Sequence, residues 1–101
     1  MVRILESKNF DKEIQEEIIL VDFYASWCPP CKMLTPVLEE VASSRKYVVG
    51  KINIDENIEI AKKYNVESVP TLIVFKNGKE VDKEVGYMEK NQVIELLDRN
   101  I

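Results

Sequence analysis

Both cysteines of the chain lie within four residues, Cys28-Pro29-Pro30-Cys31. Two thiols at this spacing can close a disulfide with each other, so the pair can accept or release two electrons without a bound cofactor. The segment before the pair is apolar, as in a buried strand, and the segment after it begins a helix. We therefore predict a dithiol–disulfide exchange site at a junction between a strand and a helix.

The strands that position this pair are indicated by apolar patterning and by turn residues. Residues 18–25 are almost continuously apolar, which favours a central strand covered on both faces. Asn77-Gly78 is a strong signal for a hairpin between the last two strands. The predicted strands span residues 2–5, 18–25, 47–54, 71–75 and 80–85.

Helical segments alternate with these strands. We predict that Ser7 caps the first helix and that residues 30–44 form the second, with a bend at Pro36. Asn57 is the predicted cap of a short third helix, which Asn65 ends in the left-handed conformation. The buried stripe of the last helix consists of Val93, Leu96 and Leu97. The order βαβαβαββα predicts an α/β fold, with a mixed sheet of about five strands flanked by four helices.

Length, composition and charge limit the possible functions. The 101 residues predict a single domain spanning 1–101, with 46% apolar and 32% charged residues. A net charge of −4 without a basic cluster argues against nucleic acid as a partner. The N-terminus shows no secretion signal and no apolar run has the length of a membrane span, so we expect a cytoplasmic protein that is not membrane-bound. In that compartment a cysteine pair is more often catalytic or metal-binding than structural.

Several segments resemble the thioredoxin family. Residues 21–32, VDFYASWCPPCK, resemble its active-site segment, and Val69-Pro70-Thr71 resembles its cis-proline loop. Residues 75–78 resemble the family's hairpin, and Val85-Gly86 resembles the glycine beside its site. The resemblance covers almost the whole chain and implies a thioredoxin fold and a protein disulfide oxidoreductase. The chain departs from the family's usual pattern by carrying proline, in place of glycine, directly after the first cysteine.

The two cysteines have different predicted roles. Cys28 starts a helix, where free backbone N–H groups and the helix dipole favour a thiolate, so we expect it to be the nucleophile. Cys31 lies one turn further and should be more buried, which suits the resolving thiol. Because Pro29 has no N–H, we expect the Cys28 thiolate to be less stabilised than with glycine there, and the redox potential to be altered.

Asp22 interrupts the apolar strand and has two interpretations. It is either an exposed carboxylate at a strand edge or a buried carboxyl group that transfers a proton for Cys31 through water. The resemblance favours the second interpretation, because Asp22 and Lys51 both match family positions, and it makes Lys51 the partner of Asp22.

The resemblance also implies a docking surface for substrate. It predicts a cis bond between Val69 and Pro70, which would turn the Val69 backbone toward an extended substrate segment beside the cysteines. The apolar surface around the cysteines is expected to comprise Trp27, Pro29, Pro30, Ile54, Val69, Gly86 and Tyr87. Its partners would be disulfide-containing proteins, with an NADPH-dependent flavoprotein, thioredoxin reductase, as electron donor. We expect a monomer whose redox group is the Cys28–Cys31 disulfide, with no bound cofactor.

Four alternatives remain at this stage. A structural zinc site takes four ligands, and the chain offers two cysteines and no histidine. A structural disulfide would close too short a loop to restrain the unfolded chain much. The fold can also serve as a redox-independent binding subunit. Finally, the chain could be a glutaredoxin-like or disulfide-donating member of the same fold, since the direction of exchange depends on its redox potential.

Overall fold

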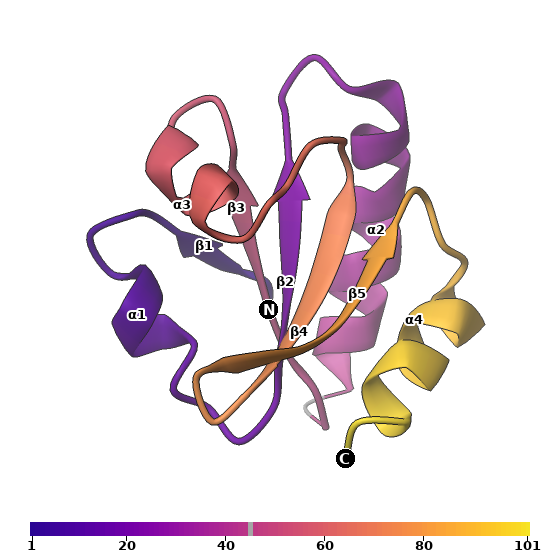
Figure 1. Cartoon of the computed structure of the whole chain (residues 1–101). Coiled ribbons are helices and arrows are strands. Elements are labelled where there is room, and N and C mark those ends of the chain that lie inside the picture. Colours follow the sequence, from indigo (N-terminus) through magenta and orange to yellow (C-terminus); the bar gives the residue numbers. More distant parts are fainter. Residues whose placement is uncertain (45) are drawn as a thin grey trace.

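The computed structural model describes residues 1–44 and 46–101. In these residues a mixed sheet has the strand order β1-β3-β2-β4-β5 (Figure 1). The strands are β1 (Arg3–Leu5), β2 (Ile19–Tyr24), β3 (Val48–Asn53), β4 (Thr71–Lys76) and β5 (Lys79–Val85). Strands β1, β3 and β2 are parallel, whereas β4 runs antiparallel to both β2 and β5. The predicted five strands and their order along the chain are confirmed.

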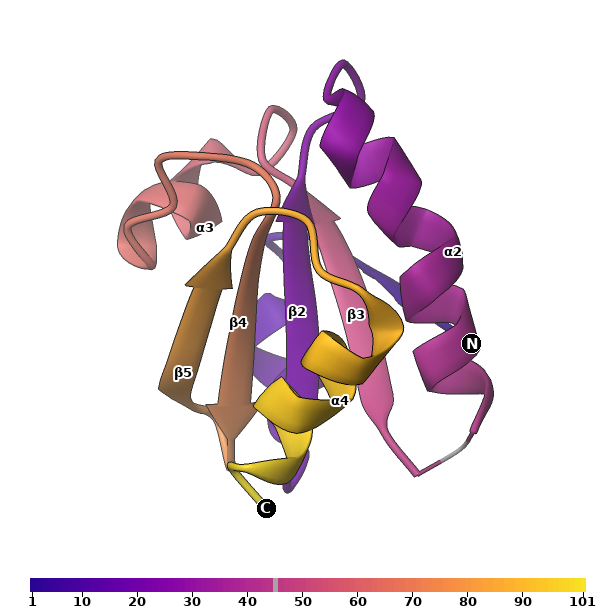
Figure 2. The same cartoon turned by 90° about the vertical axis from the view of Figure 1, so that its right-hand side faces the viewer.

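Helices cover both faces of this sheet, as expected. They are α1 (Phe10–Glu13), α2 (Pro29–Ser43), α3 (Ile58–Lys63) and α4 (Lys90–Asp98). Figures 1 and 2 show α1 and α3 on one face and α2 and α4 on the other. No helix in the described part of the chain combines the length and the apolar character needed to cross a bilayer.

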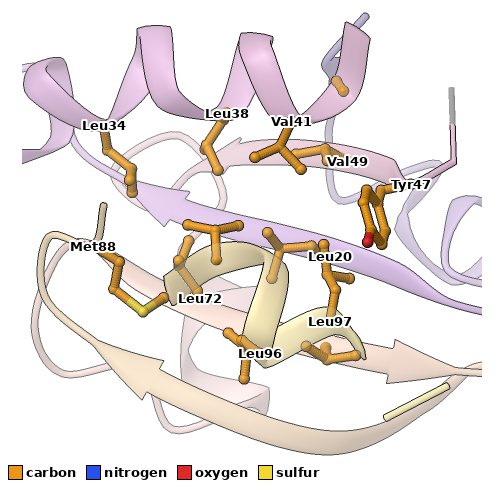
Figure 3. Packing of buried hydrophobic residues seen from close by; sticks show 13 residues of the cluster. Leu20, Leu34, Leu38, Val41, Tyr47, Val49, Leu72, Met88, Leu96 and Leu97 are labelled. Atoms are coloured by element: carbon orange, nitrogen blue, oxygen red, sulfur yellow. The ribbon is translucent and has the colours of Figure 1, made fainter. Parts of the chain in front are cut away.

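Strand β2 is the central strand and is buried on both faces. Leu20 packs in the core under α2 and α4, together with Val49 of β3, as Figure 3 shows. Ile19, Val21 and Phe23 pack in the second core, on the side of α1 and α3. Side chains alternate along a strand, so Asp22 and Tyr24 follow Leu20 onto the face covered by α2. This alternation decides which residues of β2 reach the cysteine pair.

Two turns have the predicted backbone. Asn65 ends α3 with a φ of 56°, and Asn77 and Gly78 join β4 to β5 with φ values of 52° and 84°. Positive φ at both central residues is what a tight hairpin between twisted strands requires.

The predicted N-cap at Ser7 is wrong. Helix α1 begins at Phe10 and its N-cap position is Asn9. The Ser7 N–H and hydroxyl instead donate to Asn57 Oδ1, at 2.8 and 2.9 Å. Asn57 holds the N-cap position of α3, but its side chain makes no capping hydrogen bond there. The pair joins two loops that lie 50 residues apart in the chain.

Candidate active site

The cysteine pair lies where β2 passes into α2, at the upper end of the sheet in Figure 1. Cys28 is the N-cap residue of α2, with an extended backbone at φ −96° and ψ 109°. Pro29 and Pro30 are the first two helical residues, and Cys31 is the third. A disulfide joins Cys28 to Cys31, whose Cα atoms are 5.2 Å apart. The predicted exchange pair is therefore assembled at a helix N-terminus.

Backbone donors to the Cys28 sulfur are few. The Cys31 N–H points at Cys28 Sγ over 3.2 Å. The Lys32 N–H donates to the Cys28 carbonyl oxygen at 3.2 Å, which is the first hydrogen bond of the helix. Pro29 and Pro30 have no N–H to offer. Of the first three helical residues, Cys31 alone can stabilise negative charge on Cys28 through its backbone.

The expectation that Cys31 is more buried than Cys28 is wrong. Each residue is only 3% exposed, so the pair lies just beneath the surface. The side chains of Tyr24, Ile54 and Val69 pack against the cluster that the two cysteines form with Ala25. Residues at the end of β2, after β3 and before β4 therefore help to cover the pair.

The loop before β4 supplies the other side of the site. The Val69–Pro70 peptide bond is cis, as the resemblance implied. The Val69 carbonyl oxygen lies 3.7 Å from Cys28 Sγ. The Gly86 N–H donates to the Pro70 carbonyl oxygen at 2.8 Å and so joins the end of β5 to this loop. Gly86 has a φ of 104°, a conformation that glycine adopts without strain.

Several of the predicted docking residues lie beside the cysteines. Ile54 and Val69 pack on the pair, whereas Trp27, Pro29 and Pro30 are exposed beside it. Tyr87 is half-buried and packs in part against the core under α2 and α4.

Asp22 lies on the face of the sheet that α2 covers. It is 2% exposed, so the interpretation as an exposed edge carboxylate is wrong. Burial raises the pKa of Asp22 to about 7, an effect that the positive charge of Lys51 partly offsets. Within the described part of the chain, Asp22 Oδ1 has no hydrogen-bond partner. A carboxyl group that titrates near neutrality is suited to accept and return a proton.

Lys51 is the register partner of Asp22 on β3. Its Nζ lies 5.1 Å from the centroid of the Tyr24 ring. A surface pocket of about 200 Å³ borders both Cys31 and this lysine. The pocket is lined by Tyr24, Ala25, Ser26, Cys31, Lys32, Thr35 and Lys51. The structure thus brings Cys31 and Lys51 to the same small opening, with Asp22 on the same face of the sheet.

Comparison with known proteins agrees with this geometry. The family model for thioredoxin matches residues 1–99. The chain is 50% identical to a thioredoxin of Chlamydia pneumoniae over 99% of both chains. It is 48% identical to a thioredoxin of Staphylococcus haemolyticus, over 100% of this chain and 98% of the relative. A solved mutant thioredoxin from Halobacterium salinarum NRC-1 superimposes with a TM-score of 0.89 at 35% identity, over 98% of this chain and 88% of that one.

The chain belongs to the thioredoxin family. The full-length match to thioredoxins, together with a cysteine pair at disulfide distance, makes it a thiol–disulfide oxidoreductase. Its fold is the thioredoxin fold. The redox group is the Cys28–Cys31 disulfide, and no cluster of three or more potential metal ligands occurs among residues 1–44 and 46–101.

Asp55 is a site residue that the sequence analysis missed. Trp27 is 66% exposed, and its Nε1–H donates to Asp55 Oδ2 at 2.8 Å. Asp55 follows β3 by two residues, and Trp27 follows the neighbouring parallel strand β2 by three. The carboxyl ends of adjacent parallel strands meet at one edge of the sheet. The positions of Trp27 and Asp55 just after two such strands could therefore have predicted that the two side chains lie close together. The hydrogen bond fixes the orientation of an exposed indole beside the thioredoxin-type cysteine pair.

Proposed function

We propose that this thioredoxin-family chain reduces disulfides in protein substrates by cycling Cys28 and Cys31 between dithiol and disulfide. The observation that carries the proposal is the disulfide at the N-terminus of α2, beside the Val69 carbonyl. An exposed indole at Trp27 adds an apolar contact area next to it. This arrangement combines a redox pair with a surface on which an extended protein segment can lie.

The reaction proceeds in two exchange steps. The Cys28 thiolate attacks one sulfur of the substrate disulfide, forms a mixed disulfide and releases the other substrate sulfur as a thiolate, which takes up a proton from water. Cys31 then loses its proton and attacks Cys28, which closes the Cys28–Cys31 disulfide and releases the second substrate sulfur. Two electrons pass to the substrate, which leaves with two thiols.

Asp22 is the acceptor of the Cys31 proton in this scheme. Its pKa of about 7 allows it to take a proton at neutral pH and return it later. Water in the pocket lined by Cys31 and Lys51 provides the route between Cys31 and the buried carboxyl group. Lys51 supplies the positive charge that keeps part of the Asp22 population ionised.

The substrate docks on the surface around the cysteines. An extended segment pairs with the backbone of Val69, whose carbonyl oxygen is 3.7 Å from Cys28 Sγ. The Pro70 carbonyl oxygen accepts a hydrogen bond from the Gly86 N–H, which holds the loop in place. The apolar contacts come from Trp27, Pro29, Pro30, Ile54, Val69, Gly86 and Tyr87.

The double proline gives this site its own redox character. Because Cys31 supplies the only N–H among the first three helical residues, the Cys28 thiolate has fewer donors than with glycine at position 29. We infer that the thiolate is less stabilised and that the redox potential differs from that of a Cys-Gly-Pro-Cys site.

The proposal extends to the cellular setting. Residues 1–101 act as one domain and as a monomer in the cytoplasm, without a bound cofactor and without nucleic acid or membrane partners. A net charge of −4 supports the exclusion of nucleic acid. The oxidised protein is recharged by an NADPH-dependent flavoprotein, thioredoxin reductase.

Insulin reduction tests the proposal. Turnover is expected with NADPH and a thioredoxin reductase, and much slower turnover with glutathione as the only reductant. Efficient turnover with glutathione would instead support the glutaredoxin-like alternative.

Two matched cysteine variants test the separate roles. Cys31→Ser should trap a mixed disulfide between Cys28 and the substrate, detectable by mass spectrometry, whereas Cys28→Ser should trap none and lose turnover. Full turnover by Cys28→Ser would refute the assigned nucleophile.

A further inference from the structure

The ring of Tyr24 faces the ammonium group of Lys51. The Lys51 Nζ lies 5.1 Å from the ring centroid, within the range of a cation–π interaction. Tyr24 is the last residue of β2 and is half-buried, as is Lys51. Burial, with the charges of Glu56 and Asp22, raises the pKa of the Tyr24 hydroxyl, so the ring stays neutral at physiological pH.

Strand geometry places this contact directly beside Asp22. Asp22 and Lys51 are register partners on the parallel strands β2 and β3, so their side chains leave the same face. Tyr24 is two residues beyond Asp22 and shares that face. The lysine side chain therefore reaches along the sheet from the level of Asp22 toward Tyr24, where the pocket beside Cys31 opens.

The surroundings of Lys51 leave the ammonium with few other anchors. Among the described residues, no carboxylate lies within 4.0 Å of Lys51 Nζ. Helix α2 contributes a second cation, Lys32, to the same pocket, and β4 places the apolar Leu72 opposite Asp22. Glu56, after β3, acts on Tyr24. The ring is thus the contact that determines where the Lys51 charge is held.

We propose that Tyr24 is a positioning residue, whose ring holds the Lys51 ammonium in the pocket beside Cys31 and so keeps a positive charge near Asp22. This inference rests on the proposed proton-transfer role of Asp22 for its functional meaning. The placement of Lys51 by the ring can be tested without turnover.

Loss of the ring has a defined consequence. A lysine ammonium is strongly hydrated and is carried by a flexible side chain. Without the ring, the Lys51 side chain therefore reorients so that its ammonium lies in solvent. It does not move onto Asp22, because a residue only 2% exposed can be reached only by removing water from the ammonium. Asp22 then loses a stabilising positive charge and titrates at higher pH than in the native protein.

Nuclear magnetic resonance of the Asp22 side-chain carboxyl carbon, in the oxidised protein, measures this titration directly. Lys51→Gln removes the positive charge and should move the Asp22 titration to higher pH. The size of this shift defines the full effect of the lysine. Tyr24→Leu should move it in the same direction by a part of that amount. Tyr24→Phe, which keeps the ring, should titrate close to the native protein, and Tyr24→Met replaces the leucine variant if that variant fails to fold.

A double-variant cycle separates positioning from a purely structural role. In the Lys51→Gln background, Tyr24→Leu should cause no further shift, because there is no ammonium left to hold. An equal shift in both backgrounds, an unchanged titration in Tyr24→Leu, or a shift to lower pH would each overturn the inference. Because the titration requires no substrate, a failure of insulin reduction leaves this result intact.

Discussion

Replacing Asp22 with asparagine removes a buried carboxyl group that has no hydrogen-bond partner at Oδ1 in the described part of the chain. Asparagine has nearly the same shape as the protonated carboxyl group but does not ionise in this range. The substitution therefore isolates the free energy of burying a negative charge at this position of β2.

The pKa of Asp22 gives the size of this effect. Its pKa is raised from an ordinary value of 3.8 to about 7. Each pH unit of that interval corresponds to about 1.4 kcal/mol of differential stability, so the ionised carboxylate destabilises the native state by about 4 kcal/mol. This figure applies at pH values above the native pKa, where the carboxyl group is ionised in both states.

The sign follows from proton binding. Between pH 3.8 and about 7 the native state holds a proton that the unfolded state has released. The free energy of unfolding therefore falls as pH rises through this window and stays low above it. The Asp22→Asn variant should have a higher free energy of unfolding than the native protein. This difference should be below about 1 kcal/mol at pH 4 and should increase by about 3 to 4 kcal/mol between pH 4 and pH 8.

Urea unfolding of both oxidised proteins, at several pH values between these limits, measures the difference. Any constant cost of the asparagine amide cancels when the two ends of the pH range are compared. Asp82→Asn, followed separately at pH values from about 2 to 4, is a control of opposite sign, because the hydrogen bond from Arg99 lowers the pKa of Asp82 to about 2. That variant should lose stability relative to the native protein as pH rises through the interval from about 2 to 3.8.

Parallel pH profiles for the native protein and Asp22→Asn would refute this reasoning. They would mean that Asp22 has the same pKa folded and unfolded, so that it is hydrated or paired in solution. The proton-transfer role would then lose its physical basis, even if the variant reduced insulin more slowly.

Three further predictions concern the helix start, the chain end and the hairpin. Pro29→Gly should make the Cys28 thiol more acidic by adding a backbone donor, as followed by thiolate absorbance during pH titration; equal or lower acidity would refute the proline argument. Arg99→Gln should lower the free energy of unfolding at neutral pH, because the Arg99 Nε–H donates to Asp82 Oδ2 at 2.8 Å. The variant should also lose less stability than the native protein when the pH is lowered through the Asp82 titration. An unchanged acid midpoint would contradict this. Gly78→Ala should destabilise the protein by about 1 to 2 kcal/mol in urea unfolding, because alanine strains at a φ of 84°, and a neutral result would contradict the turn assignment.

Most of the fold can be predicted from short-range sequence signals. The apolar run of β2, the Asn77-Gly78 turn and the stripe of α4 each depend on neighbouring residues, and β2, β4 and β5 each lie within a residue of their predicted bounds. The failure at Ser7 shows the limit. Its local preference for an N-cap is outweighed by hydrogen bonds to Asn57, 50 residues away, which no local pattern reveals.

The same limit applies to the candidate site. The identities of Cys28 and Cys31 were predictable, because the pair and its helix are contiguous. Their equal burial was not, because the residues that pack on the cysteine cluster include Ile54 and Val69, which come from other loops. The hydrogen bond from Trp27 to its carboxylate partner spans 28 residues and likewise depends on where two strands end.

Strand register links these long-range features to the short-range ones. Asp22 lies opposite Lys51 because the apolar neighbours of Asp22 on β2 fill cores on both faces of the sheet. A slip of one residue would exchange the faces of β2 and move the carboxyl group away from α2 and Cys31. The apolar residues of β2 therefore hold the polar site in place. Substitutions that loosen their packing should shift the Asp22 titration before they unfold the chain.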